Sequence, residues 1–182
     1  MPANLMALMK RRRSVRRYAP RPISKEDLTQ CLEAARLAPS ACNSQPWHFI
    51  ILDEPGLRAR VADRIFSSVY SMNKFAKEAP VLVAVVSEKM KFLASLGGQV
   101  RDTRYYLVDL GIACEHFVLQ AEALGIGSCW IGWFDEKALK EVLKLPKNKK
   151  IDIVIALGYP AEEKTVPKDR KPLEAMSSFN GY

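Results

Sequence analysis

Residues 80–86 read Pro80-Val81-Leu82-Val83-Ala84-Val85-Val86, a proline followed by an unbroken apolar run. Such a run is typical of a strand that is buried on both faces. Further strands are predicted at residues 48–52, 128–132 and 151–157, the last of them also buried. Because strands and helices mix without a strict βαβ repeat, the pattern favours an α+β layered domain.

Five segments have the patterns of helices. The longest runs from Thr103 to Leu124 and carries apolar residues on most sides, so we expect it to be central or to lie at a dimer interface. Gly125 is suited to cap its C-terminal end. Another helix begins after Ser24 and stops before Pro39. The remaining helices are predicted at residues 3–11, 55–65 and 135–143.

The composition is ordinary for a globular protein. The chain has 182 residues, 48% of them apolar and 26% charged, which fits a single domain spanning 1–182. No apolar run approaches the roughly 18 to 20 residues that a membrane span needs, and the N-terminus lacks the charge order of a secretory signal, so we expect a cytoplasmic protein. Four scattered cysteines and two separated histidines predict reduced thiols and no metal site.

A net charge of +8 is compatible with nucleic acid, an anionic membrane surface or a phosphorylated ligand. One concentration of this charge is Lys10-Arg11-Arg12-Arg13-Ser14-Val15-Arg16-Arg17-Tyr18. Guanidinium groups pair bidentately with phosphate, and a serine hydroxyl can add a hydrogen bond. The alternatives are a solvated charged stretch and a nucleic-acid contact. Tyr18 is the one aromatic residue in the stretch, which weakens the nucleic-acid interpretation.

A second candidate segment is Ala38-Pro39-Ser40-Ala41-Cys42-Asn43-Ser44-Gln45-Pro46-Trp47. Its amides and hydroxyls can offer donors and acceptors to a heteroaromatic ring, although a plain helix-to-strand connection is the alternative. The sequence contains no G-x-G-x-x-G after a strand, no G-x-x-x-x-G-K and no G-x-S-x-G. These absences argue against Rossmann, P-loop and serine-hydrolase sites.

Together, residues 12–18 and 38–47 closely resemble the nitroreductase family of FMN-dependent oxidoreductases. Three further stretches resemble that family in the same order: Asp109-Leu110-Gly111-Ile112-Ala113, residues 124–132, and the basic residues 167–172. The resemblance spans nearly the whole chain. It implies a nitroreductase-like α+β fold with a central mixed sheet flanked by helices. It also implies an intertwined homodimer whose C-terminal extension reaches the partner.

The resemblance also implies which residues contact FMN. Around the phosphate, ribityl chain and pyrimidine edge it places Arg12, Arg13, Ser14 and Arg16, with Lys168 and Arg170 returning from the C-terminus to the phosphate. Around the isoalloxazine ring it places Pro39, Ser40, Ala41, Asn43 and Gln45 of the other subunit, and Trp130, Ile131 and Gly132 near flavin N5. Asn73 is a further expected flavin contact. Arg16 is the candidate charge for stabilising the reduced flavin.

The implied function is reduction of nitroaromatics, quinones or related acceptors by NADH or NADPH, in a ping-pong hydride transfer that needs no catalytic side chain. The expected partners are a second copy of the chain and a small acceptor, not nucleic acid or a membrane. Larger family members carry inserted helices where this chain has only a short segment between Val86 and Thr103, so the acceptor stays open.

Several alternatives remain. Within the same fold, these are a flavin-binding or redox-sensing module with little turnover, a reductive dehalogenase and a flavin-destroying enzyme. A basic nucleic-acid-binding protein is the alternative from another class. Arg11, Arg17 and the cluster Lys147–Lys150 have no predicted role.

Overall fold

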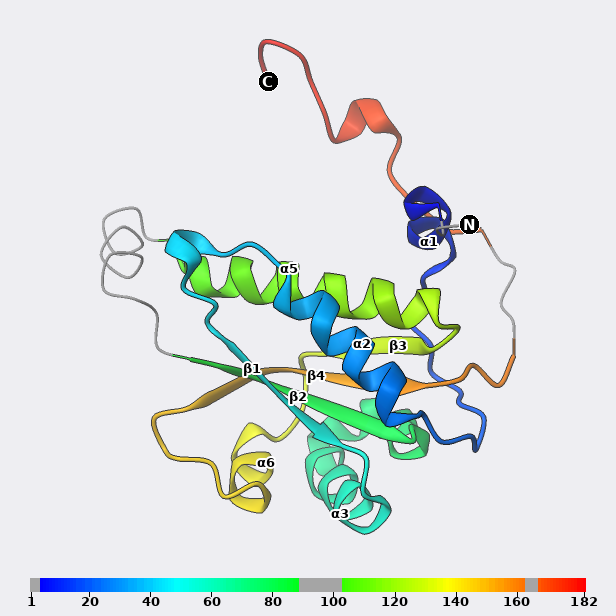
Figure 1. The fold of residues 1–182 in the computed structure, drawn as a ribbon, viewed down its shortest axis with the longest axis vertical. Coiled ribbons are helices and arrows are strands. Elements are labelled where there is room, and N and C mark those ends of the chain that lie inside the picture. Colours follow the sequence, from blue (N-terminus) through cyan, green and yellow to red (C-terminus); the bar gives the residue numbers. More distant parts are fainter. Residues whose placement is uncertain (1–3, 89–102, 163–166) are drawn as a thin grey trace.

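The computed structural model describes residues 4–88, 103–162 and 167–182. Its four-stranded sheet has the spatial order β1-β2-β4-β3 (Figure 1). The strands are β1 (Trp47–Leu52), β2 (Val81–Ser87), β3 (Gly127–Ile131) and β4 (Lys150–Gly158). All four predicted strands are therefore confirmed, with ends that differ by at most one residue.

Neighbouring strands of the sheet are antiparallel in every pair, so the predicted mixed sheet is wrong for these four strands. The end of β1 at Leu52 pairs with Leu82 near the start of β2, because the helical segments between them return the chain to the same end of the sheet. Among the described residues, parallel pairing is limited to an isolated bridge between Ser14 and Ser128.

The strand β2 is buried on both faces, as its sequence predicts. Its odd-numbered residues from Val81 to Val85 pack in one apolar core, and its even-numbered residues from Leu82 to Val86 pack in the other. This division follows from the alternation of side chains along a strand. Figure 1 shows the two layers that supply the cores. The helices α2 (Lys25–Arg36) and α5 (Tyr105–Ala123) cover one face, and α3 (Pro55–Ile65) and α6 (Glu136–Val142) cover the other.

Helix ends follow the predicted capping residues. The Ser24 hydroxyl accepts a hydrogen bond from the backbone N–H of Asp27 at the start of α2. Gly125 has a φ of 74°, the left-handed conformation that closes the C-terminal end of α5. The first helix, α1 (Leu5–Arg11), begins after Asn4, whose side chain accepts from the next turn. All five predicted helices are present.

Three 3₁₀ segments were not predicted. They are η1 (Ala41–Asn43), η2 (Ser68–Glu78) and η3 (Leu173–Ala175). Short 3₁₀ turns are stabilised by few hydrogen bonds and need no long apolar period, so the sequence pattern does not reveal them. The short segment discussed between Val86 and Thr103 falls largely at residues 89–102, outside the described residues.

Large apolar side chains remain exposed on one side of the molecule. Leu107 and Val108 on α5 are 41% and 54% exposed, and the residues after 167 expose Leu173, Met176 and Phe179. In Figure 1 the C-terminal segment leaves the body beside α1 and extends away from the sheet. No helix in the described part of the chain is both long and apolar enough to cross a membrane.

Gly158 lies where two other segments come close to the end of β4. A Cβ atom added there would lie 2.6 Å from Pro80 Cδ and 2.7 Å from Tyr18 Cδ1. These atoms belong to a proline ring and to a buried tyrosine ring, which have little freedom to move. The sequence therefore requires glycine here for close packing.

Gly158→Ala is expected to lower the free energy of unfolding by about 1–3 kcal/mol, because the added methyl overpacks the core. Urea denaturation measures this difference. Gly181→Ala is the control: nothing lies within 4 Å of its added Cβ, and a change within about 0.5 kcal/mol is expected. Equal effects of the two substitutions would contradict the packing argument.

Candidate functional site

The basic segment is held along the outer edge of β3. The N–H of Val15 donates to the carbonyl of Ser128 at 2.9 Å. The Tyr18 hydroxyl donates to the carbonyl of Val15 at 2.6 Å, and burial of that ring raises the pKa of Tyr18. These contacts fix the backbone from which the arginine side chains of residues 11–17 project.

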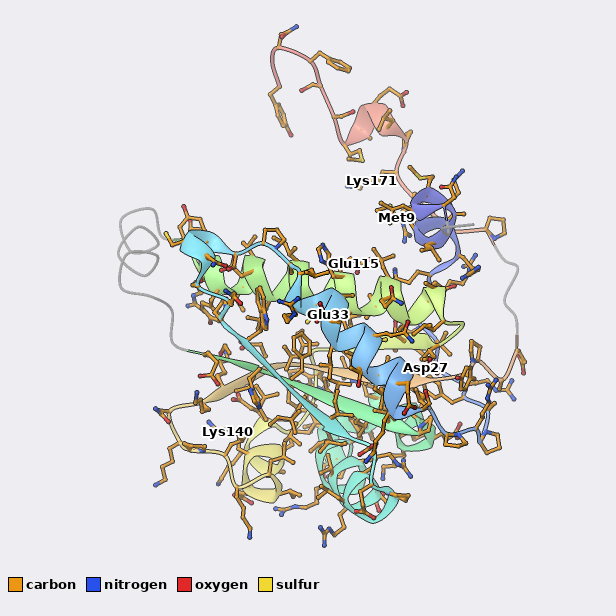
Figure 2. The ribbon with its side chains drawn as sticks, viewed as in Figure 1. Met9, Asp27, Glu33, Glu115, Lys140 and Lys171 are labelled. Carbon is orange, nitrogen blue, oxygen red and sulfur yellow. The ribbon has the colours of Figure 1, made fainter. Side chains whose placement is uncertain are left out.

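A hollow of about 460 Å³ lies between this segment, α5 and the C-terminal residues. Its lining consists of Met9, Lys10, Arg12, Arg13, Glu115, Pro167, Lys168 and Arg170. Figure 2 labels two of these residues, Met9 on α1 and Glu115 on α5, beside the C-terminal segment that carries Lys171. The hollow therefore brings together Arg12, Arg13, Lys168 and Arg170, which were predicted to share one phosphate although the two pairs lie far apart in sequence.

Positive charge is in excess in this hollow. Its lining carries five cationic side chains and one carboxylate, Glu115, whose Oε1 lies 3.6 Å from Arg12 Nε. Lys168 donates to the carbonyl of Met9. Partial burial, followed by the charges of Arg12, Arg170 and Arg13, lowers the pKa of Lys168. A bound anion would offset both the repulsion among the cations and the cost of the solvation that Lys168 has lost.

Arg11 and Arg17, which had no predicted role, form ion pairs. Arg11 Nε donates to Glu122 Oε1 at 2.6 Å, and its Nη2 donates to the Glu122 carbonyl in the last turn of α5. Arg17 Nη1 lies 2.5 Å from Glu162 Oε1. Arg16 differs from both, since its guanidinium lies 5.7 Å from the centre of the Phe75 ring.

Trp133, just after the end of β3, makes hydrogen bonds to η2. Its Nε1 donates to the Val69 carbonyl at 3.0 Å, and its own carbonyl accepts from Asn73 Nδ2 at 2.8 Å. Its ring centre lies 5.2 Å from that of Tyr70. The predicted site residue Asn73 is therefore held beside the predicted segment 130–132. Sequence reasoning missed Trp133, because a single aromatic residue after a strand carries no motif.

Gly132 follows β3 and faces open space, with nothing within 4 Å of a Cβ built on it. Ser14 bridges to Ser128 on the same strand, and Arg16 lies over Phe75 in η2. The edge of β3 thus gathers the predicted residues of the basic segment, η2 and 130–132 in one region. Among the described residues no group of His, Cys, Asp or Glu is arranged to hold a metal ion.

The loop 39–45 lies apart from this region within one chain. The N–H of Ala41 donates to Asp109 Oδ1 near the start of α5, whereas Arg11 pairs with Glu122 near its end. At 1.5 Å rise per residue, the part of α5 between these contacts is roughly 20 Å long. Figure 1 shows the two segments near opposite ends of the helix. One chain does not bring Pro39, Ser40, Ala41, Asn43 and Gln45 to the basic hollow.

Adding inorganic phosphate is expected to raise the pKa of Lys168, because the anion offsets the neighbouring cations. Without phosphate, the pKa lies below the ordinary value of 10.5, so the charged ammonium costs stability at neutral pH. That cost falls as the pH rises above the folded-state pKa and is absent above the ordinary pKa. NMR titration of the Lys168 side chain measures its pKa with and without phosphate. Sodium chloride at equal ionic strength is the control, and an equal shift in both salts would contradict specific anion binding.

Comparisons with known proteins agree with the geometry. The sequence model of the Nitroreductase family matches residues 9–71 and 67–159. A relative from Archaeoglobus fulgidus, classed as an NADH dehydrogenase/NAD(P)H nitroreductase, is 37% identical over 157 residues, which is 84% of this chain and 83% of the relative. An iodotyrosine deiodinase from Thermotoga neapolitana is 27% identical, with 98% of each chain covered.

The fold also matches solved structures. The structure of an FMN-dependent nitroreductase from Clostridium difficile R20291 has a TM-score of 0.77 and 27% identity, and the match covers 97% of this chain and 99% of that one. The predicted α+β nitroreductase-like fold is confirmed. The chain belongs to the nitroreductase family.

Proposed function

We propose that this chain is a single-domain FMN-dependent oxidoreductase that uses NADH or NADPH to reduce nitroaromatics, quinones or related acceptors. The observation that carries the proposal is the cationic hollow, where Arg12 and Arg13 meet Lys168 and Arg170. The relatives whose names include NAD(P)H nitroreductase and FMN-dependent nitroreductase support the same activity.

The residues present fit a flavin phosphate. Arginine and lysine surround the hollow. Partial burial and then the neighbouring cations lower the pKa of Lys168, and a phosphate dianion would supply the missing negative charge. Ser14, exposed beside the hollow, would add a hydroxyl donor. Bound FMN would supply hydride acceptance and donation, which no side chain of the chain provides.

The end of β3 fits the flavin ring. Gly132 leaves open space beside the strand, so a flat ring could approach the backbone closely. Trp130 and the backbone of Ile131, whose side chain is buried in the core, would lie beside the ring. Asn73, held by the Trp133 carbonyl, would face its edge. Arg16 would place a positive charge near the pyrimidine end. Its stacking on Phe75 would help to orient that charge.

A homodimer would complete the site. None of the described residues that line the hollow comes from the loop 39–45 of the same chain, so the loop would line the ring bound by a second copy. The exposed apolar residues of α5 and of the C-terminal segment support an interface on that side of the molecule. A cytoplasmic location is in keeping with the four cysteines, which are free thiols.

A reductive dehalogenase is the second candidate, because the Thermotoga neapolitana relative is an iodotyrosine deiodinase. Both activities would use the same flavin site and differ in the acceptor. Steady-state rates with nitroaromatics, quinones and halogenated phenols would separate them.

The decisive experiment uses purified protein and added FMN. The proposal expects a yellow protein that bleaches when NADH or NADPH is added without oxygen. A yellow protein that neither donor bleaches would instead be a flavin-binding module. A colourless protein that takes up no FMN would overturn the proposal.

Arg12→Ala is expected to weaken FMN binding roughly 10- to 100-fold, since a charge-assisted hydrogen bond contributes about 1.5–3 kcal/mol. Fluorescence titration of the flavin measures the dissociation constant. Arg17→Ala is the matched control, because Arg17 pairs with Glu162 at an exposed position where an ion pair contributes little. Equal losses in the two variants would contradict the assignment of Arg12 to the phosphate.

Val108→Asp is expected to shift the protein from dimer to monomer, because it places a charge in the proposed apolar interface. Analytical ultracentrifugation measures the mass in solution. Val69→Asp is the control, at an apolar position that is 71% exposed on η2, outside α5. A monomeric wild type, or a Val108→Asp variant as dimeric as the wild type, would contradict the interface on α5.

A further inference from the structure

Asp109 is a buried carboxylate that the proposed hydride transfer does not use. The residue is 3% exposed, and its Oδ1 accepts from the Ala41 N–H at 3.0 Å. Its Oδ2 is buried and has no hydrogen-bond partner in the described part of the chain. Burying a polar oxygen without a partner is costly, so the position of Asp109 needs an explanation.

The partner of Asp109 is the first residue of η1, in an unusual loop. Cys42, Asn43 and Gln45 have φ values of 52°, 49° and 47°, in the left-handed region that favours glycine. All three are exposed, so burial in a core does not offset this strain. Strained residues persist where surrounding contacts hold them, and they cluster at functional sites.

Polar contacts within the loop help to hold it. Within it, Gln45 N–H donates to Ser40 Oγ at 2.9 Å, and Gln45 Nε2 donates to Asn43 Oδ1 at 2.9 Å. Ser40 precedes η1 but makes no capping hydrogen bond to it. The cap comes instead from Asp109, which reaches across from α5.

We propose that Asp109 is the positioning residue of the loop 39–45: it caps η1 from α5 and thereby holds the loop in its left-handed conformation. This inference rests on the proposed function, in which that loop lines the flavin of the second copy. Asp109 itself would not touch the flavin. It would act through the backbone of Ala41.

Two substitutions separate the cap from the negative charge. Asp109→Ala removes the acceptor, whereas Asp109→Asn keeps an oxygen that can accept from Ala41. The first readout is amide hydrogen exchange of Ala41, measured by NMR on protein without flavin. We expect exchange to accelerate at least 10-fold in Asp109→Ala and to stay within about threefold of the wild type in Asp109→Asn. Unchanged exchange in Asp109→Ala would overturn the cap.

Cys42 supplies a second readout of the loop. It is the exposed cysteine, whereas Cys31, Cys114 and Cys129 are buried, and burial raises the pKa of Cys31 and Cys114 to about 12. The rate of Cys42 modification by a disulfide reagent should change at least threefold in Asp109→Ala and little in Asp109→Asn. Cys42→Ser confirms which thiol reacts. Equal rates in wild type and Asp109→Ala would count against the positioning role.

Flavin binding distinguishes positioning from a general loss of stability. We expect the FMN dissociation constant to rise at least fivefold in Asp109→Ala and to recover in the double variant Asp109→Ala/Cys42→Gly, because glycine adopts the left-handed conformation without the cap. The inference would be overturned if the double variant did not recover FMN binding and Asp109→Asn bound FMN as weakly as Asp109→Ala. If the wild type binds no FMN, the proposed function fails, while the Ala41 and Cys42 measurements still decide whether Asp109 holds the loop. If Asp109→Ala does not fold, the positioning role is tested by Ala41 amide exchange in Asp109→Asn and by FMN binding of Cys42→Gly.

Discussion

Burial of β2 on both faces is the constraint on which the other elements depend. Antiparallel sheets commonly leave one face to solvent, but the alternating side chains of β2 enter two separate apolar cores. Each core needs its own layer of helices, α2 and α5 on one side and α3 and α6 on the other. The long helix α5 is consequently fixed against the sheet. The loop 39–45 contacts it at Asp109, and Arg11 contacts it at Glu122.

The outer edge of β3 determines where the arginines lie. A free sheet edge presents unpaired backbone groups, and here Val15 donates to Ser128 on that edge. Gly127 makes the close approach possible, since a Cβ there would lie 2.6 Å from a Val15 methyl carbon. The basic segment is thus held by backbone contacts that do not depend on its charge. Arg12 and Arg13 thus reach the hollow from a backbone whose position is set by the edge of β3.

The strands and long helices could be predicted from the sequence because burial imposes a period on their apolar residues. The capping roles of Ser24 and Gly125 were equally local. The partners of Arg11 and Arg17 could not be predicted in this way. Glu122 and Glu162 lie more than a hundred residues further along the chain, and only the fold brings them close. The antiparallel arrangement was missed for a related reason: strand direction depends on how the connecting segments return the chain, which no period records.

The candidate site was predictable as residues but not as an arrangement within one chain. Its motifs identify the phosphate cluster and the loop 39–45, but among the described residues none of that loop lines the hollow of the same chain. The loop contacts α5 at Asp109, whereas Glu115, about 9 Å further along that helix, lines the hollow. In the proposed site, a ligand that contacts both motifs would therefore lie between two chains, with α5 of each near the other. The same helix that completes the core of one copy would then set the distance between the two half-sites.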